Sequence, residues 1–142
     1  MKTKNLTAAA ILSLRPGAEF VLRGNDLEWR DAQQTPPSEA DIAAEVARQE
    51  IAEAVGLYRD AVDQHIEATA RGRDYASSLH CVTYLHSTIA AWAAEAAAFI
   101  AWRDAVWVAV YAALDAWQAG GEAPTIDGLI AALPPMEWPD QP

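Results

Sequence analysis

The chain has little cysteine and little positive charge, and each shortage excludes a class of protein. Cys81 is the single cysteine among 142 residues, so an internal disulfide is impossible and a disulfide-stapled secreted domain is not indicated. Lys and Arg total 10 against 20 Asp and Glu, a formal charge of −10. Because an acidic chain repels phosphate backbones and anionic headgroups, we expect neither nucleic acid nor a membrane as a partner.

The motifs of common enzyme and metal sites are also missing. The sequence has no phosphate-binding glycine loop, no HExxH and no paired carboxylates in an evident pocket. His80 and Cys81 are neighbours, but adjacent residues on a helix point about 100° apart, so the imidazole cannot activate the thiol. His65, His80, Cys81 and His86 match no metal-ligand spacing. We therefore expect no enzyme, no cofactor and no metal.

One long uncharged stretch raises the question of a membrane span. Residues 76–94 contain no Asp, Glu, Lys or Arg. They do contain His80, His86 and several Ser and Thr, which suit a hydrocarbon interior poorly. We expect no transmembrane helix here.

The first 37 residues predict a small helix followed by a β-hairpin. Residues 7–14 form a helical run that Pro16-Gly17 ends, and residues 18–23 and 27–32 read as strands joined by Gly24-Asn25-Asp26. An isolated hairpin is marginal in water. Its apolar side chains, Phe20, Leu27 and Trp29, should therefore pack on helices or on a partner.

Residues 38–142 predict a helical region, which with residues 1–37 forms one structural domain. Ser38 is a good helix N-cap, and apolar residues at alternating steps of four and three predict one helix to about Arg71. Helical segments at 74–86 and 88–119 follow, and the sequence leaves open whether they are continuous through Ser87–Ala90. Gly120-Gly121 ends the last one.

The C-terminal end completes a mainly α fold class. Pro124-Thr125 opens a short helix at 126–133, and Pro134-Pro135 ends it and leaves an extended tail anchored by Trp138. The overall expectation is a long helical hairpin or bundle with a small N-terminal β-hairpin, a short C-terminal helix and an extended Pro-rich tail.

The segment at 88–119 carries an unusually wide apolar surface. Ala96, Phe99 and Val106 belong to one stripe with Trp92, Val110 and Trp117, and Ile100, Trp107, Tyr111 and Leu114 widen it. One narrow helix cannot cover so wide a face, so a second copy or another protein is the natural cover. The residues expected to bind a partner are Trp92, Phe99, Trp102, Arg103, Trp107, Tyr111 and Trp138.

Local alternatives stand beside this interpretation for three of those residues. Arg103 either pairs with a carboxylate of the partner or packs its stem while its head reaches Glu95, Asp104 or solvent, and we favour the second. Trp102 and Trp107 are either interface or core residues, and core packing is the commoner role of helical aromatics in a short chain.

Two stretches of the chain resemble phage proteins. Residues 92–107 (WAAEAAAFIAWRDAVW), followed by Ala119-Gly120-Gly121, Pro124-Thr125 and residues 133–139 (LPPMEWP), resemble the C-terminal region of small tail proteins of bacteriophages and prophages. The order of AAIL (9–12), PGAEF (16–20), LEW (27–29) and PPSE (36–39) is similar to a second kind of short phage tail protein. Relatives usually break the helix with a proline near Ser87–Ala90, where this chain has none.

The resemblance implies a function but brings no catalytic residues. Such proteins are commonly encoded beside tail-fibre genes and described as tail or fibre-assembly proteins. We therefore expect a non-enzymatic tail protein, in the virion tail or in the host cytoplasm during assembly, that binds the tail fibre or adjacent tail machinery as a chaperone or accessory subunit. The alternative is a purely architectural virion subunit that oligomerises through its long helices. Either role implies self-association or a hetero-oligomer.

Overall fold

A computed structural model describes residues 5–140 and confirms the mainly α fold class. Helix accounts for 64% of the described residues, and the described sheet is one two-stranded antiparallel hairpin. The chain divides into two compact units, Met1–Gly56 (unit 1) and Leu57–Pro142 (unit 2). This division falls inside a helix, whereas the sequence patterning placed its boundary at residue 37.

Unit 1 begins with helix α1 (Leu6–Leu14) and the strands β1 (Phe20–Arg23) and β2 (Asp26–Trp29). The strands are shorter than the sequence predicted. Gly24 has a φ of +63° at the first of the two turn positions, as a type II′ hairpin turn requires. Phe20 pairs with Trp29 across the strands, and their rings stack at 6.3 Å between centroids.

Helix α2 (Glu39–Gly72) begins in unit 1 and continues without a break into unit 2. Ser38 caps it as expected, because the Ser38 hydroxyl accepts a hydrogen bond from the Asp41 backbone N–H at 3.1 Å. Near its start the Glu45 carboxylate, 8% exposed, accepts hydrogen bonds from Arg48 at 2.6 and 2.8 Å and from Gln49 at 2.9 Å. These bonds hold the pKa of Glu45 down at about 2.

Between α2 and the next long helix the chain is less regular than the sequence predicted. The expected helix at 74–86 is shortened to α3 (Ser78–Val82) followed by the 3₁₀ helix η1 (Thr83–His86). Asp74 adopts a φ of +69°, and the Ser77 hydroxyl caps α3 by accepting from the His80 N–H at 2.9 Å. Helix formation therefore restarts only after residue 77.

Helix α4 (Ala90–Gln118) is separate from η1, which answers the question of continuity. Ser87 and Ile89 have extended backbones, and the Ser87 hydroxyl accepts a hydrogen bond from the Ile89 N–H at 3.1 Å. This local bond competes with a helical ladder, so the break needs no proline. At its other end α4 closes in a Schellman motif, with Gly120 at a φ of +104° and the Gly121 N–H donating to the Ala116 carbonyl at 3.1 Å.

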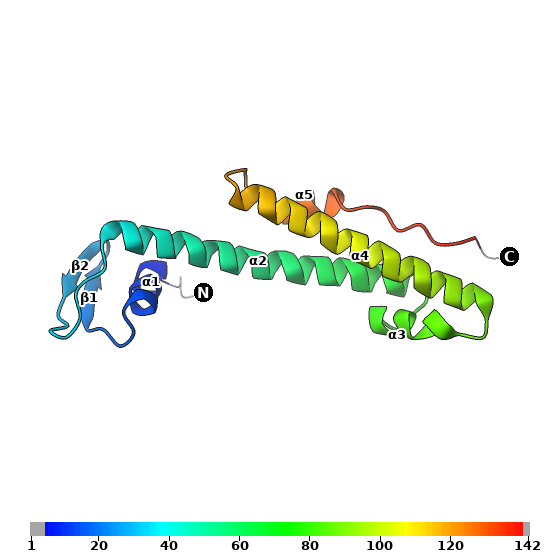
Figure 1. Ribbon diagram of the computed structural model, residues 1–142, viewed down its shortest axis with the longest axis horizontal. Helices are drawn as coiled ribbons and strands as arrows, with labels where there is room; N and C mark the ends of the chain where they lie inside the picture. The colour runs from blue at the N-terminus through cyan, green and yellow to red at the C-terminus, as the bar shows by residue number, and fades with distance from the viewer. Residues whose placement is uncertain (1–4, 141–142) are drawn as a thin grey trace. The chain divides into compact units, whose positions relative to one another are not determined.

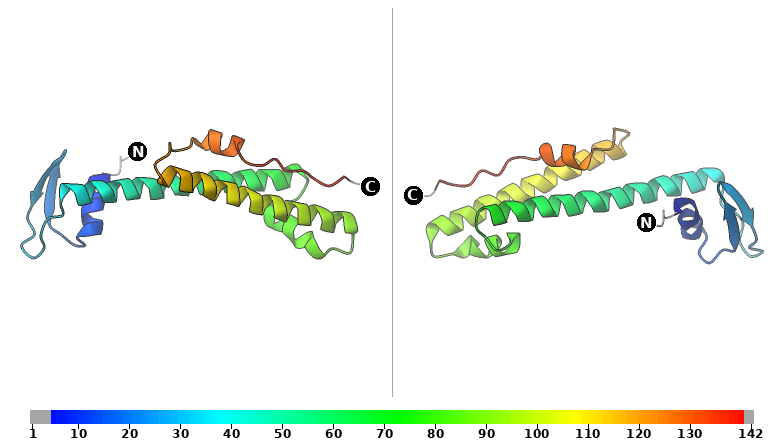
Figure 2. Two further views of the ribbon diagram at one scale, coloured as in Figure 1. Left: turned by 45° about the horizontal axis from the view of Figure 1, so that its top comes forward. Right: turned by 180° about the vertical axis from the view of Figure 1, so that it is seen from behind.

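In unit 2 the helices α2 and α4 form an antiparallel hairpin. Tyr58 contacts Trp117 near one end of it and His65 contacts Trp102 further along. Figures 1 and 2 show α3 and α5 (Ile126–Ala131) on opposite sides of this pair. The core of the hairpin consists of Tyr58, Val62, Ile66 and Ala70 of α2 and Ala96, Phe99, Trp102, Val106, Val110 and Leu114 of α4.

Candidate protein-binding surface

Two of the aromatic residues named as candidate partner contacts, Phe99 and Trp102, lie in the core of unit 2. Phe99 is 0% and Trp102 7% exposed, and the rings lie 5.6 Å apart. The Trp102 indole N–H donates to the Pro134 carbonyl at 2.8 Å. Their surfaces and the indole N–H are already used within unit 2, so both residues have a packing role, which for Trp102 is the core alternative that the sequence favoured.

Trp138, a third expected contact, is partly buried against unit 2. Its ring stacks on Phe99 at 5.9 Å and on Tyr75 at 6.2 Å between centroids. The guanidinium carbon of Arg73 lies 5.5 Å from the Trp138 ring, within range of a cation–π interaction. The extended tail is thus attached to the chain's own helices and does not present Trp138 as a free docking residue.

A buried carboxylate organises the same region. Glu95 is 4% exposed and accepts hydrogen bonds from Arg73 at 2.6 and 2.9 Å and from the Tyr75 hydroxyl at 2.7 Å. Burial and the bond to Glu95 raise the pKa of the Tyr75 hydroxyl, and the bond to Glu95 raises that of Arg73. This ion pair fixes the segment after α2 against α4, which is a structural role.

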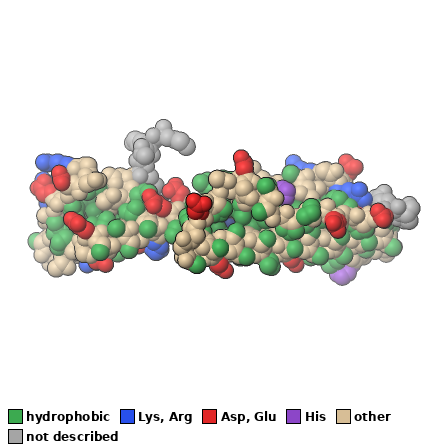
Figure 3. Space-filling model, turned by 90° about the horizontal axis from the view of Figure 1, so that it is seen from above, with side chains coloured by type: hydrophobic (Ala, Val, Ile, Leu, Met, Phe, Trp, Pro, Cys, Tyr) green, Lys and Arg blue, Asp and Glu red, His purple; other side chains and the backbone are tan. Residues whose placement is uncertain are grey.

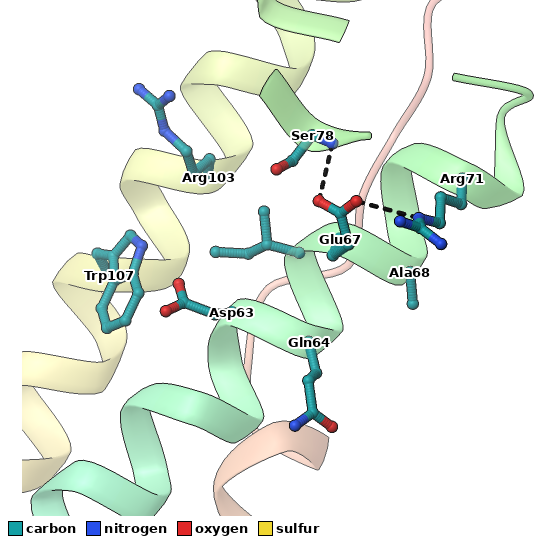
Figure 4. Close-up of a pocket in the computed structure, with 9 residues that line it drawn as sticks. Asp63, Gln64, Glu67, Ala68, Arg71, Ser78, Arg103 and Trp107 are labelled. Carbon is teal, nitrogen blue, oxygen red and sulfur yellow. Dashed lines mark hydrogen bonds and ion pairs between the residues drawn. The ribbon is translucent and has the colours of Figure 1, made fainter. Parts of the chain in front are cut away.

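Arg103 takes the local arrangement that the sequence favoured. Its guanidinium donates to the carboxylate of the next residue, Asp104, at 2.9 and 3.1 Å. Arg103 also lines a groove formed by residues of α2, α4 and Ser78, and in Figure 4 its guanidinium points away from Glu67. Arg103 is therefore already paired within its own helix.

That groove of about 650 Å³ places a carboxylate opposite an aromatic ring. Asp63 of α2 and the half-buried Trp107 of α4 face each other in it, while Glu67 is bound to Ser78 and Arg71 (Figure 4). The Ser78 backbone N–H donates to Glu67 at 2.9 Å, and this bond lowers the pKa of Glu67. Because Trp107 lines an open groove and is only half-buried, part of its ring stays on the surface.

The side of α4 that points away from α2 is exposed and mostly apolar. We define the outer face of α4 as Ala94, Ala97, Ala101, Asp104, Ala105, Val108, Tyr111, Ala112 and Asp115, all exposed. At about 100° per residue these positions lie opposite the buried stripe of the same helix. Val108 is 70% and Tyr111 49% exposed. Small side chains around two projecting apolar ones suit close packing of another protein.

A second exposed aromatic residue lies at the beginning of α4. Trp92 is 44% exposed and meets Tyr84 edge-on at 5.5 Å. Leu85 and Ile89, just before α4, are also exposed. Of the seven residues expected to bind a partner, Trp92, Trp107 and Tyr111 thus still offer surface on this helix.

The structure separates the residues that suggested chemistry. His80 is exposed on α3, and its Nδ1 accepts a hydrogen bond from the Ala76 N–H at 3.2 Å, whereas Cys81 is 0% exposed. Burial raises the pKa of the Cys81 thiol to about 11. Within residues 5–140 no three His, Cys, Asp or Glu side chains converge as a metal site. Another histidine of the set, His65, packs its ring on that of Trp102, with 5.7 Å between the ring centroids.

Among the described residues, α4 is the one helix long and apolar enough to cross a membrane by length and composition. It lies mostly outside the 76–94 stretch considered from the sequence. A span through α4 would carry Arg103 and Asp104 into hydrocarbon, at about 2.5–3.5 kcal/mol each near the bilayer centre. Those residues and the ion pair of Glu95 favour a helix covered by protein, and the expectation of no membrane partner stays a prediction.

Sequence reasoning missed the outer face of α4 because it followed the large aromatic residues. A helical-wheel count of the exposed alanines, with Val108 and Tyr111 among them, was the available signal. Glu95 was missed as an organising residue, since nothing local distinguishes a buried carboxylate from a solvated one. No protein-family model, curated protein or solved structure matches this chain.

Proposed function

We propose that this protein is a non-enzymatic phage tail protein that binds the tail fibre or adjacent tail machinery, as an assembly chaperone or an accessory subunit. The tail assignment rests on the resemblance of residues 92–107 and 133–139 to small phage tail proteins. The binding role rests on one observation, the exposed apolar outer face of α4, where Val108 is 70% exposed. A soluble chain rarely leaves so apolar a helix face uncovered unless a partner occupies it.

The physical mechanism follows from the side chains of this face. Alanines let a partner backbone approach closely, and Val108 and Tyr111 supply the apolar area that the contact buries. A β-rich fibre subunit exposes apolar surface and strand edges before it is assembled, and covering them prevents aggregation. Acidic side chains are scattered over the surface in Figure 3, while Lys and Arg gather in fewer places. That charge keeps the complex soluble.

The proposal also defines where the protein acts. A chaperone works in the host cytoplasm during phage assembly and leaves, whereas an accessory subunit stays in the virion tail. In the alternative, the protein is an architectural tail or baseplate subunit, and the outer face of α4 packs against another copy.

The test is co-expression with the tail-fibre protein encoded beside this chain. The parent should raise the soluble yield of the fibre, and Val108→Asp and Tyr111→Asp should each abolish most of the increase by placing a charge in the interface. Leu57→Asp is the matched control, because Leu57 is 56% exposed on α2 and lies outside the outer face. Circular dichroism must first show that all three variants keep parental helicity.

Each outcome separates the candidates. If the folded α4 variants raise the yield as much as the parent, the outer face of α4 is not the binding surface. If the parent has no effect and mass spectrometry finds it in purified particles at fixed copy number, the architectural alternative replaces the chaperone. Flotation of the parent with anionic or neutral vesicles would instead show that the protein binds a membrane.

A further inference from the structure

Unit 1 contains an apolar groove of about 880 Å³ that the proposed function does not use. Its walls come from α1, the β-hairpin and the first part of α2. Its floor is formed by the buried Ile11 and Pro37 and by the half-buried Leu22, Leu27, Ile42 and Val46. A groove with this lining is suited to an apolar side-chain row.

The rim of the groove carries charge of one sign. Asp26, Glu39 and Glu50 line it, and none of the described lining residues is Lys, Arg or His. Within residues 5–140 these three carboxylates form no hydrogen bond or ion pair. Arg23 faces Asp26 across the hairpin, but its guanidinium lies 3.7 Å from Glu28 instead. Among residues 5–140 the lining thus carries negative charge and no positive one.

The spacing of the carboxylates matches a helical occupant. Glu39 and Glu50 lie eleven residues apart on α2, about 16 Å along the helix axis. Ile42 and Val46, with Ala43 and Ala47, fill the interval between them on the same side. At about 5.4 Å per turn, the interval between Glu39 and Glu50 corresponds to about three turns of an occupant helix. An apolar row bracketed by two basic residues is the complement of this surface.

We infer that this groove binds a basic amphipathic helix of a partner protein, with its apolar face on Ile42, Val46 and Leu27 and its Lys or Arg residues beside Glu39, Glu50 and Asp26. Burial of the apolar row supplies affinity, and the carboxylate rim selects positive over negative helices. The site lies within unit 1 and does not depend on the outer face of α4 or on the phage assignment.

The probe is a synthetic, fluorescein-labelled peptide of about fifteen residues, with Leu and Ala on one helix face and Lys at both ends about eleven positions apart. The full-length protein is titrated into it and fluorescence anisotropy is measured. A peptide with Glu in place of Lys is the charge control. We expect the Lys peptide to bind at least about tenfold more tightly than the Glu peptide, with an affinity that falls as salt is raised.

Two pairs of variants test the location. Ala43→Lys places a positive charge in the groove at an exposed helix position, and Ala52→Lys makes the same change on α2 outside it. Ala43→Lys should weaken binding at least about tenfold and Ala52→Lys less than about twofold. The double variant Glu39→Gln/Glu50→Gln should weaken binding of the Lys peptide about three- to tenfold. The control double variant Glu19→Gln/Glu53→Gln removes two carboxylates outside the groove and should leave this affinity unchanged.

Three results would overturn the inference. The first is equal affinity for the Lys and Glu peptides, or no binding of either at about 100 μM protein, which corresponds to about −5.5 kcal/mol. The second is an unchanged affinity of folded Ala43→Lys for the Lys peptide. The third is concentration-dependent dimerisation of the parent that Ala43→Lys abolishes, because a second copy of the chain would then occupy the groove. None of these results bears on Val108 or on fibre solubility.

Discussion

Replacing Trp138 by Ala tests whether the C-terminal tail belongs to the core of unit 2. The substitution removes the stacking of this ring on Phe99 and Tyr75 and its contact with Arg73. Full burial of a tryptophan removes about 150–250 Å² from water, about 4–6 kcal/mol at 25 cal/mol per Å². Because Trp138 is only partly buried and the tail can relax, we expect about half, 2–3 kcal/mol.

A loss of this size is measurable by thermal denaturation followed by circular dichroism. For a unit the size of Leu57–Pro142, it corresponds to a fall in the Tm of about 10–20 °C. Trp92→Ala is the matched control, because Trp92 is 44% exposed and, among the described aromatic rings, contacts Tyr84 alone. The Tm of this variant should fall by less than about 5 °C. Truncation after Pro135 should reproduce the effect of Trp138→Ala.

The Tm values of Trp138→Ala and Trp92→Ala also show which result would contradict a core role for the tail. If Trp138→Ala and Trp92→Ala lower the Tm equally little, the tail does not contribute to the core. Trp138 would then regain its role as a free docking residue, as the sequence alone suggested.

Three further predictions concern buried or hydrogen-bonded side chains. Glu95→Gln should lower the Tm more than Asp104→Asn, because it leaves the partly buried Arg73 without its counter-ion, whereas the Arg103–Asp104 pair is at the surface. If the two variants lower the Tm equally, the Glu95–Arg73 pair does not stabilise unit 2. The pKa of Glu45 falls from 4.5 to about 2 on folding, so its contribution to stability is complete above about pH 4.5 and is lost as the pH falls toward 2. Urea midpoints of Glu45→Gln should therefore vary less over that range than those of the parent, and parallel curves would contradict the shift. Cys81, with a pKa of about 11, should resist a thiol reagent at about pH 8 until urea unfolds the chain; rapid reaction of the native protein would show that the sulfur is accessible.

The sequence by itself determined the elements with strong local signals. The N-cap at Ser38, the Gly24 turn and the Gly120-Gly121 stop are confirmed at those residues, because each depends on the hydrogen bonds or φ preferences of a few adjacent residues. Periodicity likewise predicted the long helices of the hairpin, although it joined residues 74–77 to a helix that begins only at Ser78.

Only the tertiary structure decided what each aromatic residue does. Sequence periodicity cannot distinguish Phe99, Trp102 and Tyr111, because all three are large apolar residues on one helix. Their exposure differs because α2 and the tail cover one side of α4 and leave the outer face open. The buried pair of Glu95 with Arg73 and the groove of unit 1 are likewise contacts between residues far apart in the chain. Local propensities contain no information on such contacts, which depend on how the folded surfaces meet.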